Sequence, residues 1–266
     1  DFDPARDSVP YDQLLEIDRW ILHELSTLEK QVRQAYADYE FHKIYHWLHE
    51  FSVVQLSAIY LDILKDRVYC AGGPSPERRA AQTTQYLLFE HLVRLAAPIL
   101  VFTADEAYTH LAGHGESVHL ETLLEPDPQW HQPKLGEEWA RLLEVRGEVL
   151  RALEDARQVK RAIGQSLEAR VALVPRSAQW RELLKRHEHD LAEIFITSQA
   201  EIVDEPLPAE TIVARFEGNA TLVDVAMALG SKCERCWRVL PSVGKDEQYP
   251  TLCERCAKVV RRYYNG

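Results

Sequence analysis

Four cysteines constrain the fold of this sequence more than any other feature, because they repeat one short motif. Cys233 and Cys236 form a first Cys-x-x-Cys pair, and Cys253 and Cys256 form a second pair after sixteen intervening residues. This spacing is typical of zinc ribbons. Two such turns bring four thiolates to one ion and close a tetrahedral shell, which leaves no position for water. The pattern therefore predicts one structural zinc ion bound by all four cysteines.

Two disulfides, or free thiols, are the alternatives to zinc. Only one further cysteine, Cys70, occurs in the sequence, and no signal-peptide pattern opens it. Disulfides are rare in reducing compartments, so we expect a cytoplasmic protein with a zinc site. No apolar run approaches the about 20 residues of a membrane span, and we expect no membrane partner. The opening Asp1, without an initiator Met, indicates a piece of a longer polypeptide.

The segment that holds the four cysteines is basic, although the whole chain is acidic. Residues 231–266 carry eight Lys and Arg residues against four Asp and Glu residues, whereas the whole chain has a net charge of −11. Such a basic segment on an acidic body is typical of a localised contact with a polyanion. Trp237 lies between Arg235 and Arg238, and aromatic rings beside arginines suit the unstacked bases of RNA. Alternatively, Trp237 only covers the small zinc core.

Apolar residues at steps of three and four predict four helices. The first runs from about residue 10 to 39, the second from a break near residue 40 to residue 69, and the third from 76 to 111. Pro98 should kink the third helix, because proline removes one backbone donor. A fourth helix is expected over 136–163. Three long helices of this kind make an antiparallel bundle.

Two sets of apolar residues are expected to face the core of this bundle. Those on the second helix are Ile44, Trp47, Leu48, Phe51, Val54, Ala58 and Leu61. Those on the third helix are Tyr86, Phe89, Leu92, Val93, Ala96, Leu100 and Phe102.

The pattern changes to short strands after residue 166. Residues 167–174 alternate with a period of two, which predicts a half-buried strand, and further strands are expected at 199–203, 211–216 and 221–229. Residues 178–195 read as helical. We therefore predict a mainly α protein, with a helical bundle over 1–135, a connecting helix over 136–165, a small α+β unit over 166–230 and a four-cysteine zinc ribbon over 231–266.

Patterns that carry catalysis are absent from the sequence. It contains neither a glycine-rich phosphate loop nor a G-x-S-x-G motif, and Cys70 has no readable base partner. His42, His46 and His49 have helical spacing, but without an HExxH pattern a polar helix edge is favoured over a metal site. We expect that this chain catalyses nothing on its own.

Several motifs together resemble bacterial isoleucyl-tRNA synthetases, in the family's order and over nearly the whole chain. They are Tyr60-Leu-Asp-Ile-Leu-Lys-Asp-Arg67, Leu95-Ala-Ala-Pro-Ile-Leu-Val-Phe-Thr-Ala-Asp-Glu106, Arg146-Gly-Glu-Val149, Ile163-Gly-Gln-Ser-Leu-Glu-Ala169, and the cysteine pairs in Lys232-Cys-Glu-Arg-Cys-Trp237 and Leu252-Cys-Glu-Arg-Cys256. The valine, leucine and methionine enzymes share the first motifs in weaker form. The four-cysteine segment is what points to the isoleucine enzyme.

The resemblance implies an anticodon-binding bundle of the class I synthetase type, followed by a C-terminal zinc domain. The parent enzyme is an ATP-dependent isoleucine–tRNA ligase that uses magnesium, but its HIGH and KMSKS signatures are absent from this sequence. The catalytic and editing domains are therefore expected partners in the same polypeptide. The implied function is recognition of the anticodon stem-loop of isoleucine tRNA.

The expected RNA contacts fall into two groups. At the end of the second helix, Lys65 and Arg67 are candidates for phosphate contacts, which position RNA without reading its sequence; alternatively, they only satisfy the helix C-terminus. In the ribbon, Trp237 is expected to stack on a base and Arg235 or Arg238 to contact a base edge or a phosphate. Arg255 and Lys258 complete the candidate set.

Three other functions remain as alternatives. The chain could belong to a sibling class I synthetase of the valine type, or to a zinc-ribbon module that binds nucleic acid or only protein. DNA glycosylases with the same cysteine spacing use an N-terminal amine nucleophile such as proline, whereas this sequence opens with Asp1-Phe2-Asp3 and has a helical, acidic body.

Overall fold

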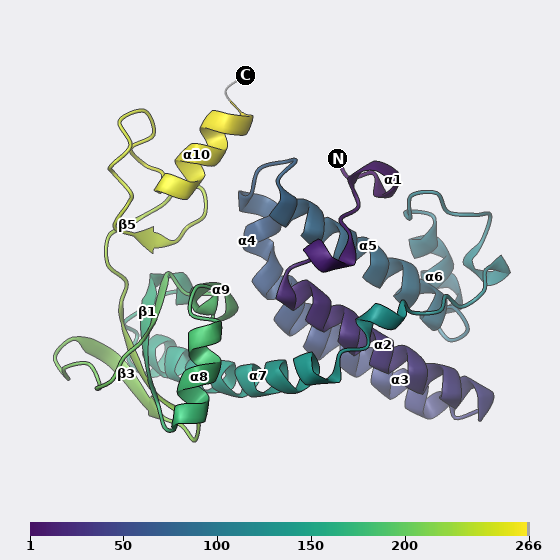
Figure 1. Cartoon of the computed structure of the whole chain (residues 1–266), viewed down its shortest axis with the longest axis horizontal. Helices are drawn as coiled ribbons and strands as arrows, with labels where there is room; N and C mark the ends of the chain where they lie inside the picture. The colour runs from purple at the N-terminus through teal and green to yellow at the C-terminus, as the bar shows by residue number, and fades with distance from the viewer. Residues whose placement is uncertain (265–266) are drawn as a thin grey trace. The chain divides into compact units, whose positions relative to one another are not determined.

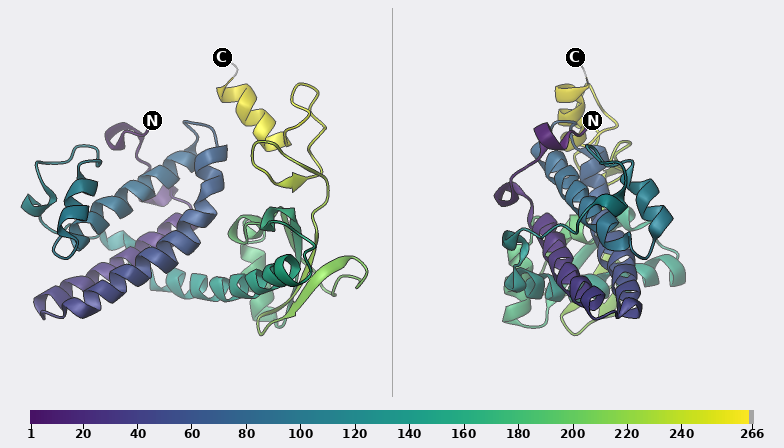
Figure 2. Two further views of the ribbon diagram at one scale, coloured as in Figure 1. Left: turned by 180° about the vertical axis from the view of Figure 1, so that it is seen from behind. Right: turned by 90° about the vertical axis from the view of Figure 1, so that its right-hand side faces the viewer.

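The chain folds into two compact units in the computed structural model, which describes residues 1–264 (Figures 1 and 2). The first unit is Asp1–Gly136 and the second is Glu137–Gly266. The finer division of the chain into four parts stays a prediction. Within residues 1–264, no helix combines the length and the apolar character that crossing a membrane would require.

The first unit is helical, with long segments that follow one another and pack side by side. α2 packs against α3, η2 and α5, and α4 packs against α5. Figure 1 shows α3 and α4 as parts of one long helical path beside α2. The elements are α1 (Pro4–Asp7), η1 (Tyr11–Gln13), α2 (Glu16–Ala37), α3 (Phe41–Glu50), η2 (Phe51–Leu61), α4 (Asp62–Cys70), α5 (Pro76–Ala96), α6 (Val101–Tyr108), η3 (Val118–Leu120) and η4 (Pro128–Trp130).

The second unit joins one long helix to a small sheet and to the segment with the four cysteines. The predicted strands all form, within one to two residues of their expected bounds. The elements are α7 (Pro133–Glu154), which begins just before the unit boundary, η5 (Asp155–Val159), η6 (Ser166–Glu168), β1 (Ala169–Pro175), α8 (Ala178–Arg186), α9 (Leu191–Ile194), β2 (Gln199–Ile202), β3 (Ile212–Glu217), β4 (Thr221–Met227), β5 (Ser231–Lys232), β6 (Val239–Leu240) and α10 (Glu254–Tyr263).

The second long helix is not α-helical throughout, and this changes which side chains are buried. η2 is a π-helix, in which each N–H group donates to the carbonyl five residues before it. Its wider turn departs from the 3.6-residue period on which the prediction rested. Phe51 is buried as predicted, but Val54, Ala58 and Leu61 are exposed. For these three residues the prediction was wrong.

Pro98 ends the third helix instead of kinking it. α5 stops at Ala96 and α6 begins at Val101, with Leu100 in a non-helical conformation. Proline lacks a backbone N–H group and its ring clashes with the carbonyl one turn earlier, so the helix breaks here, although Ala97 itself keeps helical dihedral angles. As a result Leu100 and Phe102, which we predicted to be buried, are 51% and 89% exposed.

A buried ion pair connects the first and second long helices. Asp18 on α2 accepts hydrogen bonds from both terminal nitrogens of Arg67 on α4, at 3.0 and 2.6 Å, and from the hydroxyl of Tyr60 at 2.8 Å. Asp18 and Tyr60 are fully buried, and Arg67 is 5% exposed. Burial, followed by the nearby Asp18 carboxylate, raises the pKa of Tyr60 well above its usual value. A hydrogen-bonded cluster of three polar side chains therefore takes the place of apolar packing at this contact.

The small sheet of the second unit has the strand order β2-β1-β4-β3. β1 and β2 are parallel and are joined through α8 and α9, whereas β4 pairs antiparallel with both β1 and β3. Glu148 of α7 accepts hydrogen bonds from the backbone N–H groups of Ala220 and Thr221, at 2.8 and 2.9 Å, and from the Thr221 hydroxyl at 2.8 Å. One buried carboxylate thus fixes α7 to the turn between β3 and β4.

We predict that Arg67→Ala lowers the free energy of unfolding by about 3–5 kcal/mol, because it leaves Asp18 as a buried, uncompensated charge. Urea denaturation followed by circular dichroism measures the change. Lys65→Ala is the matched control: its ammonium group is paired with Asp62 at the surface, and such a pair contributes at most about 1 kcal/mol. Equal effects of the two substitutions would contradict this role for Arg67.

Candidate metal centre and nucleic-acid interface

The four predicted cysteines converge on one point in the second unit. All four are buried, and their Sγ atoms lie within 4.8 Å of one another. The Sγ atoms of Cys236 and Cys253 are 3.8 Å apart. A tetrahedral ion with metal–sulfur bonds of about 2.3 Å requires sulfurs about 3.8 Å apart, so the cluster fits such an ion. Among the described residues, this is the one group of metal-ligating side chains that lies close enough together to bind an ion.

Short backbone motifs bring the sulfurs together. The first pair lies in a hairpin, where β5 pairs antiparallel with β6 and the N–H group of Trp237 donates to the carbonyl of Cys233 at 2.8 Å. Trp237 has a φ of 64°, in the left-handed region that closes this turn. The second pair begins a helix, because Cys253 precedes α10 and accepts a hydrogen bond from the N–H group of Ala257 at 2.9 Å. A tight turn and a helix start are what the Cys-x-x-Cys spacing requires.

A glycine is needed where the chain enters the hairpin. Gly230 has a φ of 109°, and a Cβ atom there would lie 2.2 Å from the backbone carbon of Leu240. The two strands of the hairpin therefore approach each other more closely at this point than any side chain would allow.

Hydrogen bonds among the thiols shift the pKa values of two cysteines in opposite directions. Hydrogen bonds from the thiols of Cys236 and Cys256 lower the pKa of Cys253 to about 3. Hydrogen bonds with Cys236 and Cys253 raise the pKa of Cys256, because its thiol donates to these two sulfurs. One sulfur is thus ionised first, and a divalent cation would stabilise the thiolate form of the others.

Two donors of the protein also point at sulfur atoms. The backbone N–H group of Cys253 lies 3.3 Å from the Sγ atom of Cys233, and Nη1 of Arg235 lies 3.8 Å from the Sγ atom of Cys256. Hydrogen bonds of this kind stabilise thiolates and orient them. Arg235, which we predicted as an RNA contact, therefore also belongs to the surroundings of the metal centre.

Cations and aromatic rings alternate over the segment 231–264, which we call the ribbon. The Trp237 ring is 58% exposed, and the ammonium group of Lys232 lies 5.8 Å from its centroid. Arg235 lies 5.9 Å from the ring of Tyr264, and Arg262 lies 5.1 Å from the ring of Tyr263. Lys232 and Tyr264 are not among the predicted RNA contacts; the signal that could have indicated them is the gathering of charged and aromatic residues around the two cysteine pairs.

The other predicted ribbon contacts have different surroundings. Arg255 and Lys258 are exposed, and the Lys258 ammonium group pairs with Glu254 at 2.6 Å. Arg238 instead donates from two guanidinium nitrogens to the carbonyl of Thr197, at 3.3 and 3.1 Å. Beside it, the N–H group of Val239 donates to the Ser198 hydroxyl at 2.7 Å. Arg238 thus fixes the ribbon to the segment between α9 and β2.

The two candidates of the first unit also differ from each other. Lys65 is exposed and forms a surface pair with Asp62 at 2.7 Å, so its ammonium group is accessible to a phosphate. Arg67 is buried and is held by Asp18. Arg67 is therefore not retained as an RNA contact, because exposing its guanidinium group would leave Asp18 unpaired in the core.

Comparison with known proteins places these features in a family. The family model described as the anticodon-binding domain of tRNA ligase matches residues 18–173. A second family model, described as a zinc finger found in FPG and IleRS, matches residues 230–259. The second match covers all four clustered cysteines, and the first covers the helices of the first unit from α2 onward.

Curated relatives agree with both matches. The isoleucine–tRNA ligase of Geobacter sulfurreducens is 44% identical over 98% of this chain, and that of Symbiobacterium thermophilum is 46% identical over 98%. The resemblance inferred from the sequence motifs is confirmed by these similarities. The chain spans about 28% of the length of these relatives. Since the first family model matches more than half of the residues, the chain belongs to the anticodon-binding domain family of tRNA ligases.

Proposed function

We propose that this chain is the tRNA-binding, C-terminal part of an isoleucine–tRNA ligase, and that it recognises the anticodon stem-loop of isoleucine tRNA. The observation that carries the proposal is the combination of two matches in one chain, an anticodon-binding domain followed by the zinc finger found in FPG and IleRS. The second match favours the isoleucine enzyme over its valine-type sibling. Relatives that are 44–46% identical add independent support.

Catalysis belongs to the rest of the polypeptide in this proposal. ATP, magnesium, the catalytic core and the editing domain act outside this chain, which contributes affinity and selection of the RNA. The parent ligase would work in the cytoplasm, as expected from the cysteine usage.

Zinc would have a structural role at the four-cysteine cluster. When bound, it would neutralise thiolate charge and hold the two Cys-x-x-Cys turns together. The ribbon's own residues then perform the recognition: Cys233 and Cys236 fix the turn that presents Trp237, and Cys253 and Cys256 fix the start of α10, which carries Lys258. The geometry of the exposed indole thus depends on the metal centre, although the metal itself does not contact RNA.

The ribbon offers two kinds of RNA contact. The exposed indole of Trp237 can stack on an unpaired base, and such stacking tolerates any base. Lys258, Arg255 and Arg235 supply charge for phosphates, which adds affinity without sequence information. In the first unit, Lys65 provides a further phosphate contact. We assign Arg238 to holding the ribbon in place, since its guanidinium group is bonded to Thr197.

We predict one zinc ion per chain in the purified protein, and none after Cys253→Ser. The substitution removes one of four ligands from a closed shell, so the ribbon should lose its structure while the first unit keeps its own. Elemental analysis measures the metal, and helical circular dichroism reports on the remaining fold. Cys70→Ala is the control, because Cys70 lies in the first unit and should leave the zinc content at one; a metal-free wild-type protein would contradict the assignment.

We predict that Trp237→Ala weakens binding of an isoleucine anticodon stem-loop about tenfold, which is the effect of losing one base–aromatic stack. Filter binding at several salt concentrations measures it. Affinity should also fall steeply with added salt, as counterion release requires, and a ribbon that binds only protein would not show this. Trp180→Ala, on α8, is the matched control and should leave the affinity unchanged; equal binding of isoleucine and valine stem-loops would favour the sibling enzyme.

A further inference from the structure

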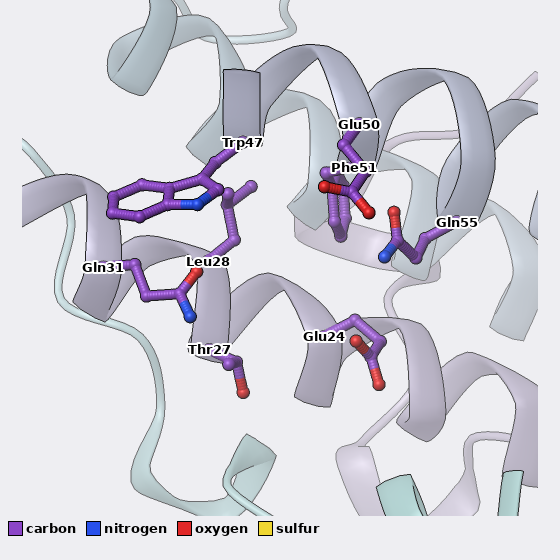
Figure 3. A pocket seen from close by; sticks show the side chains of 8 residues that line it. All are labelled: Glu24, Thr27, Leu28, Gln31, Trp47, Glu50, Phe51 and Gln55. Carbon is purple, nitrogen blue, oxygen red and sulfur yellow. The ribbon is translucent and has the colours of Figure 1, made fainter. Parts of the chain in front are cut away.

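A cavity of about 280 Å³ opens between two helices of the first unit. Glu24 and Gln31 of α2 line one side, and Trp47 and Glu50 of α3 line the other, together with Gln55 of η2. Figure 3 shows the indole of Trp47 at one end of the cavity and the side chains of Glu50 and Gln55 next to each other at the other. None of the motifs from the sequence analysis accounts for this cavity.

The polar groups of the cavity include carboxylate and amide oxygens as hydrogen-bond acceptors, beside the N–H donors of Gln31, Gln55 and Trp47. Two carboxylates line it from different helices: that of Glu50, an exposed residue of α3, lies beside Gln55, and that of Glu24 on α2 points away from them (Figure 3). The side-chain oxygen of Gln55 is buried and has no hydrogen-bond partner among residues 1–264. The lining of the cavity contains no lysine, arginine or histidine. A buried acceptor without a donor costs free energy, so the cavity is suited to a ligand that brings N–H groups.

The π-helix explains why two of these acceptors lie together. Glu50 and Gln55 are five residues apart, and on an α-helix this spacing would turn them to different sides. In a π-helix the bonded residues are five apart, so residues with this spacing lie above each other. The transition from α3 into η2 at Phe51 therefore brings the Gln55 amide next to the Glu50 carboxylate. Such helix irregularities are frequent at functional sites.

Trp47 adds a planar apolar wall to this set of acceptors. Its ring is half-buried and lies next to Leu28 in the cavity. A flat ligand can stack on the indole while its edge reaches the carboxylates, which is how unpaired RNA bases are bound in proteins. Burial also raises the pKa of Glu24, and a hydrogen bond with Trp20 partly opposes this shift.

We propose that this cavity receives one unpaired guanine of the bound RNA. The inference rests on the proposed function, since it needs an RNA ligand. Guanine is the standard base that presents two adjacent N–H donors, N1–H and N2–H, and one carboxylate accepts both. Adenine and cytosine place a ring acceptor beside their amino group, which a carboxylate repels. Uracil flanks its single N–H group with two carbonyl oxygens, which are repelled in the same way.

The test titrates nucleotides into the whole chain labelled with ¹⁵N at its tryptophan indoles, with the Trp47 signal assigned through Trp47→Phe. Guanosine monophosphate should shift this signal in a saturable way. Inosine monophosphate, which lacks the 2-amino group, should bind about tenfold more weakly, as expected for one lost hydrogen bond to a charged group. Adenosine monophosphate should give no saturable shift.

Two variants separate the cavity from general acidity. Glu50→Gln keeps the shape of the side chain and removes its charge, so guanosine and inosine monophosphates should then bind with nearly equal affinity. Glu106→Gln makes the same change on an exposed residue of α6 and should leave the tenfold preference intact. Thermal unfolding confirms that both variants remain folded.

Three results would overturn the inference. They are equal responses of Trp47 to all nucleotides, no response to any of them, and a response to spermidine alone, which would make the cavity a cation site. Stem-loop binding measured in parallel separates the two proposals. Stem-loop binding without guanine selectivity at Trp47 refutes the cavity but keeps the proposed function. Guanine selectivity without stem-loop binding refutes the proposed function and leaves the cavity as a site for a free guanine nucleotide, not for RNA.

Discussion

The convergence of four sulfur atoms is the constraint on which the fold of the ribbon depends. The ribbon has two strands of two residues each and one helix of ten residues. Besides the four cysteines, Ala257 is its one fully buried side chain among the described residues. A segment this small cannot bury enough apolar surface to fold on its own, so the proposed zinc ion would take the place of a hydrophobic core. The exposure of Trp237 is possible because no core requires it.

Unlike the ribbon, the first unit has a large hydrophobic core, and it still buries charged side chains inside that core. Asp18, Tyr60 and Arg67 satisfy one another where an apolar contact would have sufficed. Such a pair adds little net stability but is costly to break. It also fixes the register of α4 against α2, since a helix that slipped by one turn would leave both charges unpaired.

Much of this arrangement was readable from the sequence, and the failures have identifiable causes. The cysteine spacing predicted the sulfur cluster, and period-two alternation predicted β1, because both signals are local. Helical periodicity wrongly predicted that Val54 and Leu61 are buried, because no local sequence signal indicates a switch from α-helix to π-helix. The periodicity also wrongly predicted that Phe102 is buried, because the helix ends before Pro98 while the apolar pattern of the sequence continues past this proline. The sequence could not indicate that Arg67 is buried in an ion pair, because its partner, Asp18, lies 49 residues away along the chain.

The bonds from Arg238 to Thr197 and from Val239 to Ser198 have a mechanical consequence. Trp237, which we propose stacks on RNA, is followed directly by Arg238, whose guanidinium group donates to the Thr197 carbonyl just before β2. A force applied to the indole is therefore transmitted within one residue to the strand β2, and from there to its neighbour β1. Two successive residues of the ribbon are thus bonded to the segment that leads into β2, so a displacement of the indole would also load these hydrogen bonds.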